Sequence, residues 1–237
     1  MGIIAEDSPL RRIPMVIEPR QASCFEGIRL TAEMIDSAYQ RLVTNLIRFS
    51  FNPCAQELAS IGTATLFLDA WSVVDCLNRL RTILAKTPKF KKTLPPLQIY
   101  ERATKSVVGI RNIVQHLGEE IDRTSTVWPM WGILSWVAII DPKAGLCRSC
   151  SVIGGRIVSG EHQLVNPLEK GFAGIVDHVH LAVKTESIEL SSAVRSVGPV
   201  VNLIERNLYK QLPDSTSTGS DAFVFVDCVT EIASRIL

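Results

Sequence analysis

The sequence predicts an α+β fold, in which a mainly α-helical antiparallel bundle carries a small antiparallel β-sheet as an insertion or an appendage. Two observations support this prediction. Apolar residues recur at three- and four-residue steps through residues 28–126 and again after residue 186, which is the period of an amphipathic helix. Between residues 127 and 186 the period changes to two, and short apolar runs alternate with turn residues, as in β-strands.

Composition and charge narrow the functional classes. The chain has 237 residues, of which 46% are hydrophobic and 21% are charged, which is typical of a folded globular protein. The formal net charge of +1 excludes a surface that is basic throughout, so any nucleic-acid contact must use a local patch. Charges and prolines interrupt the N-terminal segment, which argues against a signal peptide and favours a cytoplasmic location. The apolar stretch 127–140 is too short to cross a bilayer, so no membrane association is expected.

The first half of the chain divides into an arm and a helical bundle. Residues 1–27 contain three prolines and no sustained apolar period, which predicts an extended N-terminal arm. Residues 28–126 are predicted to form the bundle, with Thr31 as the cap of its first helix. The second helix carries a heptad-like seam, which is typical of a packing edge between antiparallel helices. The three predicted helices of the bundle cover residues 31–52, 56–86 and 97–123.

The second half of the chain begins with a β-rich insertion, residues 127–186. Residues 187–212 predict a helix that closes the bundle or packs on the sheet, and Gly198–Pro199 marks a kink or a fresh start in it. Residues 213–237 form a polar linker and a C-terminal segment, which is interpreted as a helix although it could begin as a strand. The predicted strands of the insertion lie at residues 136–140, 146–152, 156–158 and 176–183.

The third predicted helix carries a hexad, residues 111–116, whose polar side chains could take part in catalysis. Asn112, His116 and Glu119 are spaced by four and three residues, so they share a helical face that points away from the apolar stripe around Ile110. Arg111 lies at the edge of the same face. A histidine can move a proton near neutral pH, and a guanidinium can grip phosphate oxygens with two parallel hydrogen bonds. This combination suits phosphodiester chemistry.

The hexad Arg111-Asn112-Ile113-Val114-Gln115-His116 resembles the signature of the HEPN family of ribonuclease-like helical bundles, in which a histidine follows an arginine and a polar residue. The resemblance covers about 95 residues. It implies a homodimer that brings two motifs into one cleft and cuts RNA without a metal or other cofactor. By the same resemblance, Arg111 stabilises the phosphorane, His116 is the general base or acid at the ribose 2′-hydroxyl, and Asn112 orients the phosphate or the histidine.

An alternative function is a catalytically silent bundle that serves for dimerisation or for binding a protein partner or a small ligand. Glu119 and Glu120 lower the local positive potential, which suits a protein-facing interface nearly as well as an RNA cleft. On the second helix, Asp75 could orient His116 or pair with Arg111, although its simplest partner is Arg79 at a four-residue spacing.

Two other groups of residues could form functional sites. Cys147 and Cys150 have the spacing of a zinc knuckle, and His178 and His180 could complete a Cys2His2 site, but cysteines with apolar neighbours in strands are more often core residues. The tryptophans at positions 128, 131 and 136 could stack RNA bases beside His116. We favour the simpler interpretation that they fill the junction between bundle and sheet.

Overall fold

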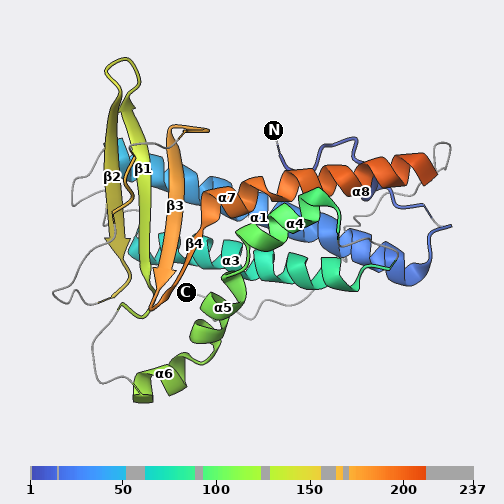
Figure 1. Ribbon diagram of the computed structural model, residues 1–237, viewed down its shortest axis with the longest axis horizontal. Helices are drawn as coiled ribbons and strands as arrows, with labels where there is room; N and C mark the ends of the chain where they lie inside the picture. The colour runs from blue at the N-terminus through green and yellow to red at the C-terminus, as the bar shows by residue number, and fades with distance from the viewer. Residues whose placement is uncertain are drawn as a thin grey trace, which may run out of the picture.

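The protein has a long helical body with a β-sheet at one end, as the computed structural model shows (Figure 1). Its longest helices, α1 (Pro19–Phe51) and α3 (Thr63–Lys86), run antiparallel to each other, and α8 (Val197–Gln211) lies along them. A mixed α+β architecture with an antiparallel sheet is therefore confirmed. The structure describes residues 2–14, 16–51, 62–88, 93–123, 129–155, 164–167 and 171–211.

Helix α1 begins earlier than the sequence predicts. The side chain of Glu18 accepts hydrogen bonds from the backbone N–H groups of Arg20 and Gln21, both at 3.0 Å, and so caps a helix that starts at Pro19. Thr31, the predicted cap, is instead a buried residue inside α1. The arm predicted for residues 1–27 is correspondingly shorter, and its short 3₁₀ helix η1 (Pro9–Arg11) packs against α1 and α8.

The third predicted helix is broken into three helices. These are α4 (Pro95–Ala103), α5 (Val107–Gln115) and α6 (Leu117–Arg123), and α6 extends away from the helical body (Figure 1). At the first break, the guanidinium of Arg81 donates to the carbonyl oxygen of Glu101 at 3.0 Å. The backbone N–H of Lys105, which would take that carbonyl in a continuous helix, bonds to Arg102 instead. A side chain from α3 therefore ends α4, and α5 leaves in a new direction.

The sheet has the order β2-β1-β3-β4 and is antiparallel throughout. Its inner face packs on the end of α1, where the indole N–H of the buried Trp136 donates to the hydroxyl of Ser50 at 2.8 Å. Trp136 thus fills the junction between helices and sheet, as expected. The predicted strand at residues 156–158 lies outside the described residues. The strands are β1 (Ile133–Asp141), β2 (Leu146–Ile153), β3 (Val176–Val183) and β4 (Glu186–Glu189).

Residues 187–212 were predicted to form a helix with a kink or a fresh start at Gly198–Pro199, and the structure has a strand and two helices in residues 186–211. Residues 186–189 pair with β3 as the edge strand β4, and α7 (Leu190–Arg195) then packs against β3 before α8 begins. The expected alternatives are therefore both realised, because α7 packs on the sheet and α8 closes the helical body. The C-terminal segment 213–237 lies outside the described residues.

A polar cluster fixes β3 to α7. The carboxylate of Asp177, which is 2% exposed, accepts hydrogen bonds from the guanidinium of Arg195 at 2.6 Å and from the backbone N–H groups of Ala173 and His178 at 2.8 and 2.7 Å. Burial alone would raise the pKa of Asp177. The three donors outweigh burial, so the pKa is lowered below its ordinary value of 3.8.

This cluster leads to a prediction about stability in acid. Asp177→Ala should lower the free energy of unfolding by about 1–3 kcal/mol, because it leaves buried donors without an acceptor. Since the pKa is lower in the folded state, the stabilisation by Asp177 is present above pH 3.8 and is lost as the pH falls through the folded-state pKa. Denaturant unfolding measured across acidic pH should therefore show a shallower acid loss in Asp177→Asn. Asp122→Asn, a change at an exposed residue of α6, is the matched control. An unchanged acid limb in Asp177→Asn would contradict the prediction.

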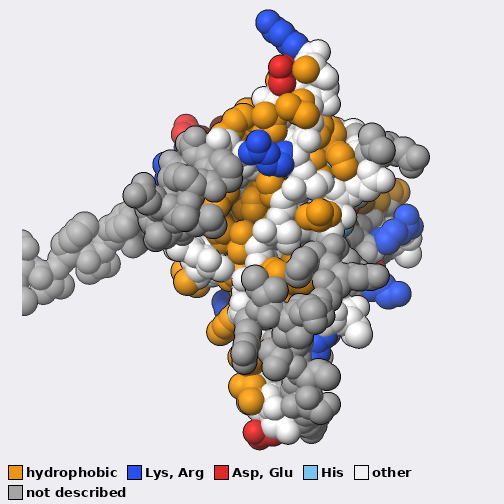
Figure 2. Space-filling model, turned by 90° about the vertical axis from the view of Figure 1, so that its left-hand side faces the viewer, with side chains coloured by type: hydrophobic (Ala, Val, Ile, Leu, Met, Phe, Trp, Pro, Cys, Tyr) orange, Lys and Arg blue, Asp and Glu red, His pale blue; other side chains and the backbone are white. Residues whose placement is uncertain are grey.

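Hydrophobic side chains are visible across the sheet end of the molecule (Figure 2). Among the large apolar residues of the sheet and its connections, Leu146 is 55% exposed and Ile175 is 54% exposed.

Candidate functional site

The hexad lies on α5 and at its C-terminal end. Val107 and Ile110 are fully buried, which orients the helix, and Asn112 on the opposite side is exposed. The predicted opposition between an apolar stripe and a polar face is therefore confirmed within α5. It does not extend further, because Val114 is only partly buried and Leu117 already belongs to α6.

Arg111 is held by an acidic partner from α3. Its Nε donates to Asp75 Oδ1 at 2.9 Å, while Asp75 Oδ2 accepts from Arg79 Nε at 2.6 Å. Burial raises the pKa of Asp75, but the hydrogen bonds from Arg111 and Arg79 outweigh it and lower the pKa. Asp75 therefore pairs with both Arg111 and Arg79, the two partners that were predicted for it. Two guanidinium groups share one carboxylate, which leaves a net positive charge at this point.

The two terminal nitrogens of Arg111 face Gln115. With its side-chain oxygen turned toward the guanidinium, Gln115 accepts from these two nitrogens at 2.9 and 3.3 Å. The Arg111 side chain is 34% exposed, so solvent or a ligand can reach it. Because Asp75 occupies only Nε, a phosphate could replace the neutral Gln115 amide as the partner of the two terminal nitrogens without breaking the ion pair.

His116 ends α5 and lies on a different side from Arg111. Its backbone N–H donates to the carbonyl of Asn112 at 3.1 Å, and its side chain is 59% exposed. The ring Nδ1 is 3.4 Å from a carboxylate oxygen of Glu119, which is 60% exposed. Five helical positions correspond to roughly 140° around the helix axis, so Arg111 and His116 point in different directions. One chain by itself does not bring both groups to the same phosphate.

The residues of the possible zinc site are not brought together. Strand β1 separates β2, which carries both cysteines, from β3, which carries both histidines. His178 contacts Glu189 at 3.0 Å and the carbonyl oxygen of Gly171 at 2.8 Å. Burial raises the pKa of the Cys150 thiol, which disfavours the reactive thiolate. Among the described residues, no group of three or more His, Cys, Asp or Glu side chains is arranged to hold a metal ion.

Two hollows border the Asp75–Arg111 pair, and the sequence interpretation did not find them. The aromatic pocket, of about 510 Å³, is lined by Phe67, Trp71 and Leu68 from α3, Val114 from α5, and Trp131. On α3, Trp71 precedes Asp75 by one helical turn, and on α5, Val114 follows Arg111 by about one turn. Trp131 lies at this pocket and is 49% exposed, whereas Trp128 lies outside the described residues.

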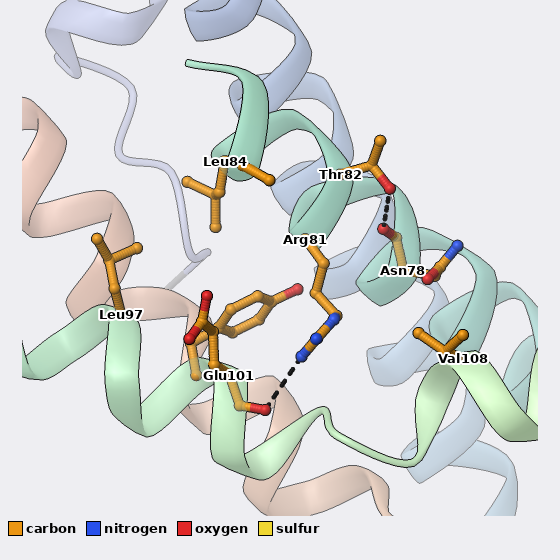
Figure 3. A pocket seen from close by; sticks show the side chains of 9 residues that line it. Asn78, Arg81, Thr82, Leu84, Leu97, Glu101 and Val108 are labelled. Carbon is orange, nitrogen blue, oxygen red and sulfur yellow. Dashed lines mark hydrogen bonds between the residues drawn. The ribbon is translucent and has the colours of Figure 1, made fainter. Parts of the chain in front are cut away.

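The second hollow, the polar pocket, has a volume of about 240 Å³ and lies between α3 and α4 (Figure 3). Asn78, Arg81 and Glu101 supply its polar groups, and Val108 from α5 closes one side. Arg81 reaches across it toward the end of α4, where it also donates to the hydroxyl of Thr104 at 2.9 Å. The cation of this pocket is therefore engaged in holding two helices together.

No family model, curated protein or solved structure matches this chain. Among the helices that the structure describes, none is long and apolar enough to span a membrane. A function must therefore be inferred from the contacts around the hexad.

Proposed function

We propose that this protein is a metal-independent endoribonuclease of the HEPN type and acts as a homodimer. The observation that carries the proposal is the state of Arg111: Asp75 orients it through Nε, the exposed Gln115 is the partner of its two terminal nitrogens, and its side chain is 34% exposed. His116 and Asn112 are exposed on the same helix, with His116 directed to another side of α5. A purely structural arginine has no need of an exposed histidine and asparagine in the family's spacing.

The proposed reaction is a transesterification within the RNA strand. His116 in its neutral form takes the proton of a ribose 2′-hydroxyl, and the resulting oxygen attacks the adjacent phosphorus. The bond from phosphorus to the 5′-oxygen breaks, and a protonated imidazole supplies the proton to that leaving oxygen. Arg111 stabilises the extra negative charge of the phosphorane, and Asn112 orients the phosphate or the imidazole. The products are a 2′,3′-cyclic phosphate and a 5′-hydroxyl.

The directions of the two main groups support the homodimer. Since Arg111 and His116 lie roughly 140° apart around α5, a cleft that contains both needs a second motif helix. An interface with twofold symmetry presents the same surface from each copy, so Arg111 of one protomer can lie opposite His116 of the other. The exposed Glu119 beside His116 would then lie near an arginine of the second copy.

The proposal is tested with the full-length protein and single-stranded RNA in the presence of a chelator. We expect cleavage that is insensitive to the chelator and leaves 2′,3′-cyclic phosphate ends, which can be identified by mass spectrometry. Cleavage that requires an added divalent cation, or that leaves 3′-hydroxyl ends, would contradict the mechanism.

The second candidate is a catalytically silent docking module. Exposed apolar side chains at the sheet end, such as Leu146, favour it, because an exposed apolar side chain suits contact with a protein partner. In that case Arg111 with Asp75 is only a structural pair, and purified protein does not cleave RNA under any condition of metal or pH.

A further inference from the structure

The aromatic pocket and the Asp75–Arg111 pair both lie where α3 packs against α5. Along α5, Val108 lines the polar pocket, Arg111 makes the ion pair and Val114 lines the aromatic pocket, at successive three-residue steps. Along α3 the order runs the opposite way, from Trp71 in the aromatic pocket through Asp75 to Asn78 in the polar pocket. The arginine therefore lies between the two hollows, with one on each side.

The aromatic pocket is built to take a flat apolar ring. Phe67 is 4% exposed and forms part of its wall, while Trp131 is 49% exposed at its side. The indole N–H of Trp71 donates to the backbone carbonyl of Trp131 at 3.3 Å, which links the two aromatic walls. A Cβ atom on Gly154 would lie 2.7 Å from Trp131 and 2.8 Å from Phe67, so glycine is needed for this close approach.

Charge distinguishes between possible occupants of this pocket. Arg111 and Arg79 share the single carboxylate of Asp75. These three side chains therefore carry a net positive charge about one helical turn from the aromatic walls. An apolar side chain of a protein partner would fill the pocket but would leave this charge without a counterpart. A nucleotide has an aromatic ring attached to an anion, and therefore matches both features.

The polar pocket suits a base less well. Its volume of about 240 Å³ is below the range of about 300–1,000 Å³ that is usual for ligand pockets, whereas the aromatic pocket is within it. Its cation, Arg81, already donates to the carbonyl of Glu101 and the hydroxyl of Thr104 (Figure 3). Of these two pockets, only the aromatic one combines a stacking surface with a partly exposed cation close by, Arg111.

We propose that the aromatic pocket is a base-binding subsite, in which a nucleobase of single-stranded RNA stacks on Trp131 and Trp71 while its phosphate binds Arg111. This inference rests on the proposed function, since it assigns a position on the RNA substrate next to the cleaved phosphate. An unpaired base is required because a base within a duplex is stacked on its neighbours and cannot enter the pocket. Stacking contributes binding that every base can supply, so the subsite favours unpaired RNA over a particular sequence.

The test measures binding separately from cleavage. The probe is a short single-stranded RNA with 2′-O-methyl riboses, which removes the attacking hydroxyl, and its affinity is measured by fluorescence anisotropy with the full-length protein. Trp131→Ala should weaken binding roughly tenfold, whereas Trp131→Phe should retain most of the affinity, because a phenyl ring still stacks. Tyr209→Ala removes an aromatic side chain of similar exposure, 54%, on the remote helix α8, and should not change the affinity.

Further measurements separate this inference from the proposed function. RNAs that each carry one abasic position are then compared. At one position of the strand, and only there, Trp131→Ala should no longer weaken binding, because the base that stacks on Trp131 is already missing. If the protein cleaves RNA but Trp131→Ala and Trp71→Ala bind the probe as tightly as the unmodified protein, the base-binding subsite is overturned and the ribonuclease stands. If the protein does not cleave RNA but binding still depends on Trp131 and on a base, the ribonuclease fails and the subsite stands. Equal weakening by Tyr209→Ala would also overturn the subsite, because the loss would then be nonspecific.

Discussion

His116→Ala is expected to lower the rate of RNA cleavage by roughly 10²–10⁴-fold, the usual contribution of a general acid–base group. The imidazole is the proton carrier in the proposed transesterification, and His116 is the histidine of the hexad. Its side chain is 59% exposed, so its removal should leave the folded structure intact. Single-turnover cleavage of a labelled RNA, with thermal unfolding measured in parallel, gives both quantities.

The matched control is Gln98→Ala, an exposed polar residue on α4. It should match the unmodified protein in rate and in melting temperature. A His116→Ala protein that cleaves as fast as this control would exclude His116 as a proton carrier. If the unmodified protein cleaves no RNA at all, the docking module becomes the better assignment.

The helical body shows which parts of a fold follow from local sequence. The three- and four-residue apolar repeat of α3 depends only on one helical face, and residues 63–86 lie within the predicted helix. The break between α4 and α5 depends on Arg81, which is more than twenty residues earlier in the chain than Thr104 and takes the carbonyl of Glu101. A contact between distant residues has no periodic signal, so the sequence predicted one continuous helix where three exist.

The sheet shows the same division between local and distant causes. Alternating apolar residues predicted the regions of β1, β2 and β3, because burial on one face imposes a period of two. The short strand β4 was missed, because its four residues are ordered by pairing with β3. Gly132 is a further case. Its φ is +91°, and a Cβ atom added to it would lie 2.5 Å from the carbonyl oxygen of Ala182. Both features require glycine, and neither can be read from its neighbours in the sequence.

The sequence predicted which residues make up the candidate site, but not how they are arranged in space. Arg111, Asn112 and His116 could be identified by spacing alone, and Asp75 could be proposed as a partner because it lies on the adjacent helix. The aromatic pocket could not be identified, because Phe67, Val114 and Trp131 come from separate segments that meet only in the folded chain. The different directions of Arg111 and His116 follow from their five-residue spacing on a helix.

A mixture of two inactive variants should regain activity. In Arg111→Ala and His116→Ala homodimers, each proposed cleft lacks one of its two groups. In a heterodimer of the two variants with twofold symmetry, one cleft lacks both groups, and the other pairs the intact Arg111 of one protomer with the intact His116 of its partner. Random exchange makes about half of the dimers heterodimers with one intact cleft of two, so about a quarter of the unmodified rate is expected.

The mixture is prepared by co-refolding or long co-incubation, and cleavage is measured against each variant alone. The control is a mixture of His116→Ala with the double variant of Arg111 and His116, in which no intact cleft can form. Recovery in the first mixture and not in the control requires that the two groups act across a dimer interface. Dimers that exchange subunits without any recovery would contradict the shared cleft, because Arg111 and His116 would then have to act within one chain, where they lie roughly 140° apart around α5.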